Sequence, residues 1–393
     1  MPTRTSPSAA SPYYVSGEVT HWTNLAHRTA ADLAATGMRV LTDTTATKIN
    51  VVDHTLDVLD NAGAPRQLSY DALVVGTGAV SARPPITGLT GPGALGPTDG
   101  VHLLHSMGDT FAVMESLARR DPKTAVIIGA GYIGLEMAEA LTTRGIAVTQ
   151  IEALPEVLPT VDPELGAVVH AELTRNGVEV LTNTTVDAIG RSEAGALTVG
   201  ATHGGQSLSR TVDFVLVVVG VKPDVELAAD AGAELGVKGA IVVDDAMRTT
   251  LPDVFAAGDC VHTHHRLLGL TWLPLGTTAH KQGRVAGENA LGGAARYAGS
   301  WEPRWSRCLI WWPRAPGYAS TKPWPPGAAG HPSAPPPPPP MITRPTTRER
   351  HPSTSGSPVT LPADSCWVPS WSGTAAPRYP NASILTPPRS STR

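Results

Sequence analysis

Three glycines with the spacing Gly129-x-Gly131-x-x-Gly134 have the residue types and order that suit one chemical task. The apolar run 125–128 comes directly before them and is typical of a buried parallel strand. In a dinucleotide-binding loop the first glycine permits a tight turn, the second lets a pyrophosphate approach the backbone, and the third lets a helix pack against the strand. This spacing therefore predicts a site for the phosphates of a dinucleotide.

Such a site needs a helix after the glycines, because the phosphates bind N–H groups at the positive end of the helix dipole. Apolar residues at a spacing of four predict this helix over residues 132–144. Tyr132 and Ile133 stand in its first turn and are therefore candidate phosphate contacts. A second apolar strand is predicted at 146–151.

Glu152 follows this second strand, about 20 residues beyond the glycines, where an acid can accept hydrogen bonds from a ribose 2′-OH. A 2′-phosphate would meet like charge there, so NAD is favoured over NADP. The alternative is an ordinary βαβ unit that binds no nucleotide. The order of strand, glycines, helix, strand and acid favours the dinucleotide interpretation.

Length, charge and cysteine content limit the remaining classes. The 393 residues suit two or three domains, and the net charge of −4 does not favour a nucleic-acid partner. No apolar run approaches the roughly 18 residues of a membrane span, and the first residues lack the apolar core of a signal peptide. Cys260, Cys308 and Cys366 give no disulfide framework. We expect a cytoplasmic protein without a membrane segment or a metal site.

The composition changes near residue 300. Seven of the nine tryptophans lie beyond it, together with most of the 37 prolines and the polyproline run 335–340. We predict that residues 300–393 form a disordered tail rich in Pro, Arg and Trp. Two explanations of the tail stay open: a frameshift near residue 300 that leaves it out of frame, and a polyproline II ligand for an SH3-type partner.

The rest of the chain reads as alternating helices and strands. Periodicity predicts helices at 22–36 and 276–291, and short strands at 38–41 and 240–243. For the run His262-x-His264-His265 we favour a solvated loop over a metal site.

Five further segments carry motifs in a fixed order: Pro12-Tyr-Tyr-Val-Ser-Gly17, Tyr70-Asp-Ala-Leu-Val-Val-Gly-Thr-Gly-Ala79, Val219-Gly-Val-Lys-Pro-Asp224, Thr250-x-x-x-Val-Phe-Ala-Ala-Gly-Asp259 and Pro274-Leu-Gly-Thr-Thr-Ala-His-Lys-Gln-Gly-Arg284. Together with the glycine loop they span roughly residues 9–299. In this order they resemble the pyridine nucleotide-disulfide oxidoreductase superfamily, and within it the branch of coenzyme A-disulfide reductases, NADH oxidases and NADH peroxidases.

The resemblance implies an α/β flavoprotein with two Rossmann-like, three-layer nucleotide-binding domains. An NAD-binding domain at 121–242 would be inserted into an FAD-binding domain made of 1–120 and 243–299. The family begins with another βαβ fingerprint, for the ADP half of FAD, and ends with a C-terminal dimerisation domain. We expect both to be missing here, which leaves the FAD domain incomplete and the family's homodimer without its interface domain.

The resemblance also implies roles for single residues. Asp259 would hold the ribityl chain of FAD, and a short acid after a strand and a glycine is well placed to accept sugar hydroxyls. Gly220 would lie beside the nicotinamide nucleotide. Glu136 would lie near the contact of flavin and nicotinamide, with a solvated helix charge as the alternative. The other implied FAD contacts are Thr77, Gly78, Gly258, Pro274, Leu275 and Thr277.

The leading hypothesis is an FAD-dependent enzyme that passes hydride from NADH to the flavin, and then electrons to a disulfide such as coenzyme A disulfide, to dioxygen or to peroxide. Ala9 stands where the family has its redox cysteine, so no mixed disulfide or sulfenic acid can form there. Cys260 is expected to pack as a small apolar residue. The alternative is a truncated, catalytically inactive chain that only binds NAD. The catalytic residues stay unassigned in both cases.

Overall fold

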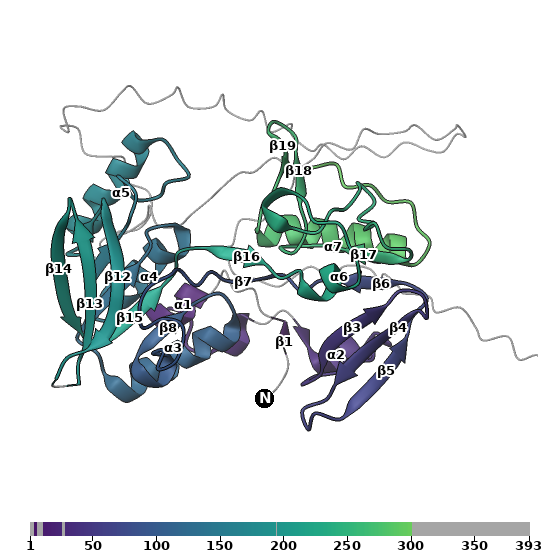
Figure 1. Ribbon diagram of the computed structural model, residues 1–393, viewed down its shortest axis with the longest axis horizontal. Coiled ribbons are helices and arrows are strands. Elements are labelled where there is room, and N and C mark those ends of the chain that lie inside the picture. The colour runs from purple at the N-terminus through teal and green to yellow at the C-terminus, as the bar shows by residue number, and fades with distance from the viewer. Residues whose placement is uncertain (1–3, 6–10, 26–27, 194, 301–393) are drawn as a thin grey trace, which may run out of the picture. The chain divides into compact units, whose positions relative to one another are not determined.

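The computed structural model describes residues 4–5, 11–25, 28–193 and 195–300 (Figure 1). All of them belong to the first of two compact units of the chain, Met1–Trp312. Ala9 and the predicted tail, apart from Ser300, lie outside the described residues. The predictions for the redox-cysteine position and for the tail's disorder are therefore not addressed by this structure.

A five-stranded parallel sheet forms around the glycine motif. Its order is β11-β10-β9-β15-β8, so β9, which precedes the glycines, lies at the centre. The strands are β8 (Val101–Leu103), β9 (Thr124–Ile128), β10 (Ala147–Ile151), β11 (Glu179–Leu181) and β15 (Phe214–Val217). The predicted strands before and after the glycine helix are both confirmed.

Both faces of this sheet are covered, because its strands are apolar at successive positions. Ala125 and Ile127 face a core that includes Leu141 of the glycine helix, whereas Val126 and Ile128 face a second core. The helices that follow β8, β9 and β10 are α3 (Met107–Arg120), α4 (Tyr132–Thr143) and α5 (Pro163–Arg175). The second core lies against an antiparallel sheet of β12 (Thr184–Arg191), β13 (Leu197–His203) and β14 (Gln206–Val212) (Figure 1).

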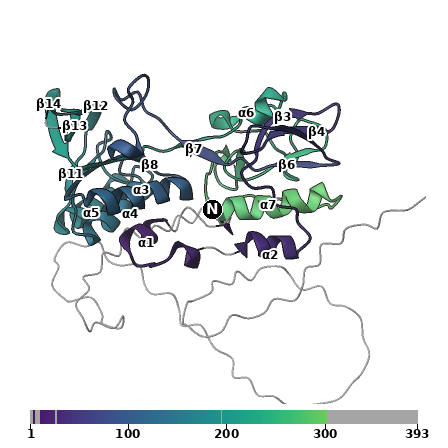
Figure 2. The same ribbon diagram turned by 90° about the horizontal axis from the view of Figure 1, so that it is seen from below.

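The short helix α1 (Ser11–Ser16), formed by the first motif, packs on α4 and α3 (Figure 2). Val15 is fully buried in the helix-side core, and its carbonyl accepts a hydrogen bond from the Arg144 guanidinium. The Thr110 hydroxyl donates to the Ser11 hydroxyl at 2.9 Å. These contacts connect α1 to the end of the glycine helix and to α3.

A smaller set of elements surrounds the motif that ends at Gly258 and Asp259. The parallel pair β6 (Leu73–Val75) and β17 (Val254–Ala256) packs against α7 (Gly276–Ala290) in one apolar core. A meander of β3 (Thr45–Asn50), β4 (Thr55–Leu59) and β5 (Pro65–Ser69) and the short helix α6 (Glu226–Asp230) complete it. We call this set the α7 unit, and the elements from β8 to β15 the five-stranded unit.

Two extended segments connect the α7 unit with the five-stranded unit. They form the antiparallel pair β7 (Ala79–Ser81) and β16 (Val221–Pro223). Lys222 pairs with Val80 in this register. The pair therefore joins two motifs that lie far apart in the sequence.

Four local predictions are wrong. The helix predicted at 22–36 is divided into a 3-10 turn, η2 (Trp22–Leu25), the short strand β2 (Arg28–Thr29) paired with β1 (Arg4–Thr5), and α2 (Ala30–Ala35). Residues 38–41 and 240–243 form no strand. In the histidine run, His264 and His265 lie in β18 (Thr263–His265), which pairs with β19 (Gly269–Thr271), so the prediction of a loop is wrong for them. The remaining 3-10 turns are η3 (Pro97–Asp99) and η4 (Val237–Gly239).

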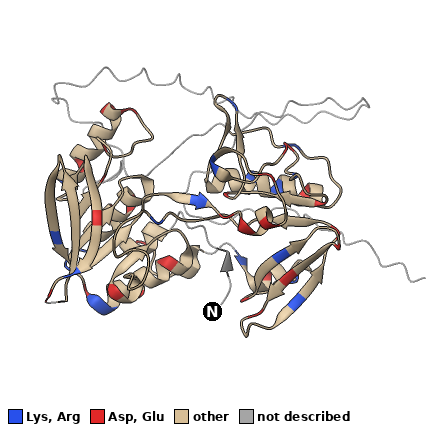
Figure 3. Ribbon diagram, viewed as in Figure 1, with Lys and Arg blue, Asp and Glu red and all other residues tan. Residues whose placement is uncertain are grey.

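Basic and acidic residues are interspersed along the elements (Figure 3), in keeping with the small net charge. Within the part of the chain that the structure describes, no helix has the length and apolar character needed to cross a membrane.

Candidate functional site

The glycine loop has the geometry that its spacing predicts. Gly129 adopts a φ of +102°, and a Cβ there would lie 2.7 Å from the carbonyl oxygen of Val218. At Gly134, in the first turn of α4, a Cβ would lie only 2.1 Å from the carbonyl oxygen of Gly129. Both positions therefore exclude every larger residue.

Gly131 is different, because no atom of the described residues lies within 4 Å of the place that its Cβ would occupy. It is also the N-cap of α4 and supplies no side-chain hydrogen bond to that helix end. Open space in front of a helix N-terminus is what a pyrophosphate requires. The loop therefore fits the phosphates of a dinucleotide.

Glu152 reaches back to this loop. It is 8% exposed, its Oε2 accepts a hydrogen bond from the Ala130 N–H at 2.7 Å, and its Oε1 accepts one from the Leu154 N–H at 3.0 Å. Each carboxylate oxygen has a second lone pair and can still accept from a ribose hydroxyl. The acid is thus held beside the loop before any ligand arrives.

Sequence reasoning missed two contacts to the loop. The Gln150 side chain donates from Nε2 to the carbonyl oxygen of Gly129 at 3.0 Å. The Leu158 N–H donates to the carbonyl oxygen of Ala130 at 2.8 Å. A glutamine on the same face of the strand as the apolar Val148 was the available signal for Gln150, whereas nothing in the sequence marked Leu158.

The other predicted coenzyme contacts lie around the start of α4. Tyr132 accepts a hydrogen bond from the Thr160 hydroxyl at 3.2 Å, and the Ile133 side chain is exposed. Gly220 follows β15 with a φ of +110°, and its carbonyl accepts from the Ala82 N–H at 2.9 Å. Glu136 is half-buried on α4, which is less exposure than a solvated helix charge would have.

The predicted flavin contacts Thr77 and Gly78 both form hydrogen bonds with Asp224, which follows β16. The Thr77 hydroxyl donates to the carbonyl oxygen of Asp224 at 2.5 Å, and the Asp224 N–H donates to the carbonyl oxygen of Gly78 at 2.9 Å. The two motifs are therefore held together by backbone and side-chain bonds as well as by the β7–β16 pairing.

Asp259 follows β17 and a glycine with a φ of +90° at Gly258. Its Oδ1 is buried and has no hydrogen-bond partner among the described residues. Burial raises the pKa of the Asp259 carboxyl, and the nearby His105 opposes this effect. A buried acceptor of this kind suits a ligand that brings hydroxyl donors.

The start of α7 lies next to this acid. The Gly258 N–H donates to Oε1 of the fully buried Gln282, and a Cβ on Gly258 would meet the Ala279 side chain at 3.4 Å. The N-cap residue Leu275 gives the helix no side-chain hydrogen bond, Thr277 in the first turn is exposed, and Pro274 just before it is half-buried. The α7 N-terminus, like that of α4, is therefore open to an anionic group.

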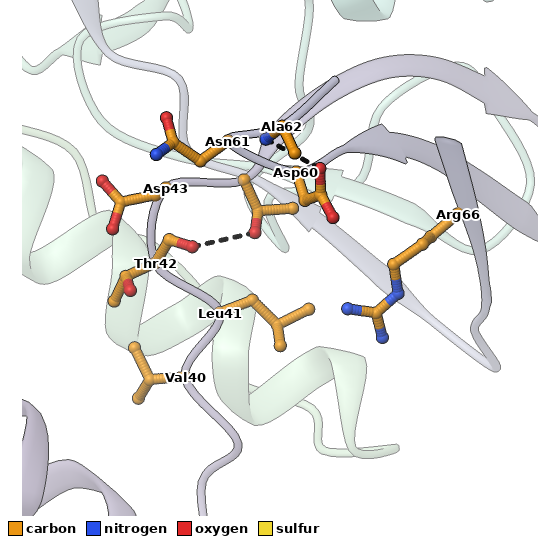
Figure 4. A pocket seen from close by; sticks show the side chains of 9 residues that line it. Val40, Leu41, Thr42, Asp43, Asp60, Asn61, Ala62 and Arg66 are labelled. Carbon is orange, nitrogen blue, oxygen red and sulfur yellow. Dashed lines mark hydrogen bonds between the residues drawn. The ribbon is translucent and has the colours of Figure 1, made fainter. Parts of the chain in front are cut away.

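Two of the hollows in the described surface have volumes of several hundred Å³. One, with a volume of about 690 Å³, is lined by Arg83, His105, Asp109, Lys222 and residues of β7, and His105 is also the group whose charge opposes the raised pKa of Asp259. The other, of about 560 Å³, lies beside the β4–β5 turn and is lined by Asp43, Asp60 and Arg66 among others (Figure 4). Neither hollow is lined by any of the predicted site residues.

The histidine run is structural. His262 is buried and bonds the backbone of Val243 at 2.8 Å, and Nδ1 of the buried His265 accepts from the N–H groups of Leu267 and Leu268. The prediction of a solvated loop was wrong, because two of the three side chains are buried and bond backbone groups. Cys260 is fully buried and burial raises the pKa of its thiol, so its prediction as a packing residue is confirmed.

Comparison with known proteins identifies the family. The family described as pyridine nucleotide-disulphide oxidoreductase matches residues 6–283. The NADH oxidase of Methanocaldococcus jannaschii is 32% identical over 292 residues, which are 73% of this chain and 62% of that protein. This match and the matches to solved structures confirm the resemblance and the α/β fold predicted from the sequence.

Solved structures share the fold, and two of them illustrate this. The NAD-dependent persulfide reductase from A. fulgidus superposes with a TM-score of 0.68 at 37% identity, over 75% of this chain and 53% of that one. An FAD-dependent pyridine nucleotide-disulphide oxidoreductase from Desulfovibrio vulgaris gives 0.57 at 34% identity, over 65% of this chain and 63% of that one. The chain therefore spans less than two thirds of the length of these relatives.

Proposed function

Because this chain belongs to the pyridine nucleotide-disulphide oxidoreductase family, we propose that it is an FAD-dependent oxidoreductase that takes electrons from NADH. The proposed acceptor is a disulfide, such as coenzyme A disulfide, or dioxygen or peroxide. The names of its relatives, an NADH oxidase and a persulfide reductase, support these acceptor classes. We also propose a cytoplasmic location.

One observation carries the NADH part of the proposal. The space beside Gly131 is open in front of α4, while Glu152 is held 2.7 Å from the Ala130 N–H. The helix dipole favours the negative pyrophosphate at this end, and the carboxylate can accept hydrogen bonds from the adenosine ribose. The same carboxylate disfavours a 2′-phosphate, so NADH is the proposed coenzyme and NADPH the weaker one.

The Asp259 region supports the FAD part. Oδ1 of Asp259 lacks a partner among the described residues, and a flavin's sugar-alcohol chain carries hydroxyl donors that could satisfy it. The residues proposed to hold FAD are Thr77, Gly78, Gly258, Asp259, Pro274, Leu275 and Thr277. When bound, FAD supplies the chemistry of hydride acceptance from nicotinamide and electron transfer to the final acceptor.

The protein's own residues bind and orient in this proposal. The α4 N-terminus would hold the pyrophosphate, and Glu152 would hold the ribose. Asp259 would orient the flavin by accepting hydrogen bonds from the hydroxyls of its sugar-alcohol chain. The Thr77–Asp224 bond and the β7–β16 pairing connect the two nucleotide sites, so that the two cofactors would be held in a fixed position relative to each other. Glu136, half-buried on α4, is proposed to lie beside the contact between them.

A second candidate function rests on Ala9. A family member that uses a redox cysteine needs a thiolate at this position, and alanine cannot provide one. The alternative is therefore a chain that binds NAD without turnover. The family's homodimeric assembly is likewise a proposal for this chain and not an observation.

The test is the visible spectrum of the purified full-length chain, before and after anaerobic addition of NADH. Flavin bands that bleach with NADH would support the proposed enzyme, and NADPH would serve as the comparison coenzyme. A colourless protein that binds NADH, measured by fluorescence titration, would support the NAD-binding alternative. A protein that neither carries flavin nor binds NADH would contradict both.

A further inference from the structure

One peptide bond of the glycine loop is held on both sides by side chains from β10 and from the residue that follows it. Gln150 Nε2 donates to the carbonyl oxygen of Gly129 at 3.0 Å, and Glu152 Oε2 accepts from the Ala130 N–H at 2.7 Å. This carbonyl and this N–H belong to the same peptide plane. A carbonyl oxygen can only accept, so the amide nitrogen of Gln150 must be the atom that faces it.

The neighbouring backbone groups are also bonded. The Gly129 N–H donates to the carbonyl oxygen of Ile151 at 2.8 Å, and the carbonyl oxygen of Ala130 accepts from the Leu158 N–H at 2.8 Å. All four backbone polar groups of residues 129 and 130 therefore have protein partners. The orientation of this peptide is fixed one residue before Gly131, where the open space begins.

Packing alone does not explain a glutamine at position 150. The side chain is fully buried, on the same face of β10 as the buried Val148. Its Oε1 has no hydrogen-bond partner among the described residues, and a buried polar atom without a partner is unfavourable. Methionine or leucine would avoid that penalty, but neither could donate to the Gly129 carbonyl.

The third glycine of the motif makes room for this contact. A Cβ at Gly134 would lie 2.9 Å from Gln150 Nε2, in addition to its clash with the Gly129 carbonyl. Gly134 thus allows the helix, the first glycine and the Gln150 amide to meet at one point.

We propose that Gln150 is a positioning residue for the coenzyme. Together with Glu152 it clamps the Gly129–Ala130 peptide, so that Gly131 and the α4 N-terminus have their binding geometry before the coenzyme arrives. This inference rests on the proposed binding of NADH, and it gives Glu152 a second task besides the ribose. Preorganisation of this kind strengthens binding, because less ordering remains to be done when the ligand binds.

The test compares Gln150→Met with the wild-type full-length chain. Methionine has nearly the same length and volume but lacks the donor. We expect the Kd for NADH and the Kd for ADP-ribose to rise by the same factor, about tenfold, because the clamp acts on the pyrophosphate half that both ligands share. The melting temperature should change by less than about 5 °C.

Gln67→Met is the matched control. Gln67 lies exposed on β5, and its amide donates to Asp57 at 2.9 Å, away from the glycine loop. Its NADH affinity should equal that of the wild type. An unchanged affinity in Gln150→Met, or a loss for NADH without an equal loss for ADP-ribose, would overturn the proposed clamp.

Hydrogen exchange gives a second measurement that needs no coenzyme. The Ala130 amide should be protected in the unliganded wild type and should exchange faster in Gln150→Met. Rapid exchange of this amide in the wild type would overturn the clamp even if the variant did not fold. Wild-type protein that failed to bind NADH would contradict the proposed function instead, so the two failures are distinguishable.

Discussion

The two candidate nucleotide sites of this chain differ in how completely the protein satisfies its own polar groups. At the glycine loop every backbone polar group of residues 129 and 130 has a protein partner, although Oε1 of the supporting Gln150 side chain has none among the described residues. At Asp259 a buried carboxylate oxygen has none among the described residues. The first site is therefore ordered without its ligand, whereas the second contains an acceptor that a ligand must satisfy.

The supporting sheets explain part of this difference. Central strand β9 lies between β10 and β15, and its alternate residues enter two separate apolar cores. The strand that leads to Asp259, β17, pairs with β6 in a two-stranded sheet that packs on α7. The central strand of the five-stranded sheet is packed on both faces, whereas β17 belongs to a sheet of only two strands. Substitutions should therefore cost more stability in the five-stranded unit than around β17.

The largest expected effect is at Gly134. Gly134→Val would place its side chain into the Gly129 carbonyl and the Gln150 amide, and should lower the free energy of unfolding by about 3 kcal/mol or more. NADH affinity, measured by fluorescence titration, should fall more than about 100-fold. The contrasting variant is Gly131→Ala, whose Cβ meets open space: it should melt like the wild type and still bind NADH about tenfold more weakly, because the methyl group fills the phosphate space. Equal melting temperatures for all three proteins would show that the loop is not tightly packed.

His102 should make the five-stranded unit sensitive to acid. It is 1% exposed on β8 and stacks on Phe214 with ring centroids 4.9 Å apart. Burial, with a contribution from Arg120, lowers the pKa of His102 from 6.5 to about 4. The folded state thus binds this proton less readily than the unfolded state, so the stability is fully present above pH 6.5 and is lost as the pH falls towards 4, by about 3 kcal/mol.

Urea unfolding at a series of pH values checks this expectation. His102→Leu should flatten the curve between pH 6.5 and 4. The control is His264→Asn, an exposed position of the histidine run, which should keep the wild-type pH dependence. A His102→Leu curve as steep as that of the wild type would assign the acid sensitivity to other groups.

Asp259→Asn tests the second of the two sites. The amide keeps the size of the carboxylate and is less costly to bury, so the flavin-free protein should lose no stability. It accepts weaker hydrogen bonds from sugar hydroxyls, so FAD affinity should fall about tenfold. Flavin content after dialysis against graded FAD measures this, with Asp253→Asn, whose side chain is 60% exposed, as the control. Unchanged FAD affinity in Asp259→Asn would remove this acid from the flavin site.

The smallest effect is expected at the surface. Arg210 Nη2 donates to Glu179 at 2.5 Å and lowers the pKa of that carboxyl, but both side chains are partly exposed. Arg210→Met should therefore lower the free energy of unfolding by less than about 1 kcal/mol. NADH affinity should not change, because the pair has no part in the loop contacts. A loss as large as that of Gly134→Val would mean that the edge of the sheet, rather than its centre, limits stability.

Local patterns predicted local structure well. The strand–glycine–helix–strand unit lies within one continuous stretch. Each element is defined by its own apolar periodicity and by the glycines at its ends. The helix expected at 22–36 and the strand expected at 38–41 were wrong, because their periodicity is weak and a strand forms only where a partner strand pairs with it. The histidine run was wrong for a related reason: its pairing with β19 and its burial depend on neighbours outside the run.

The amino-acid sequence by itself determined the family, the dinucleotide loop and the position of Glu152 beside it. These follow from glycines and an acid at fixed short spacings, where the chain has few ways to fold. Only the tertiary structure decided that Gln150 holds the Gly129 carbonyl, that an oxygen of Asp259 has no partner among the described residues and that His102 is buried. Each of these depends on which distant segments surround a side chain, and that surrounding sets the energy of a polar group.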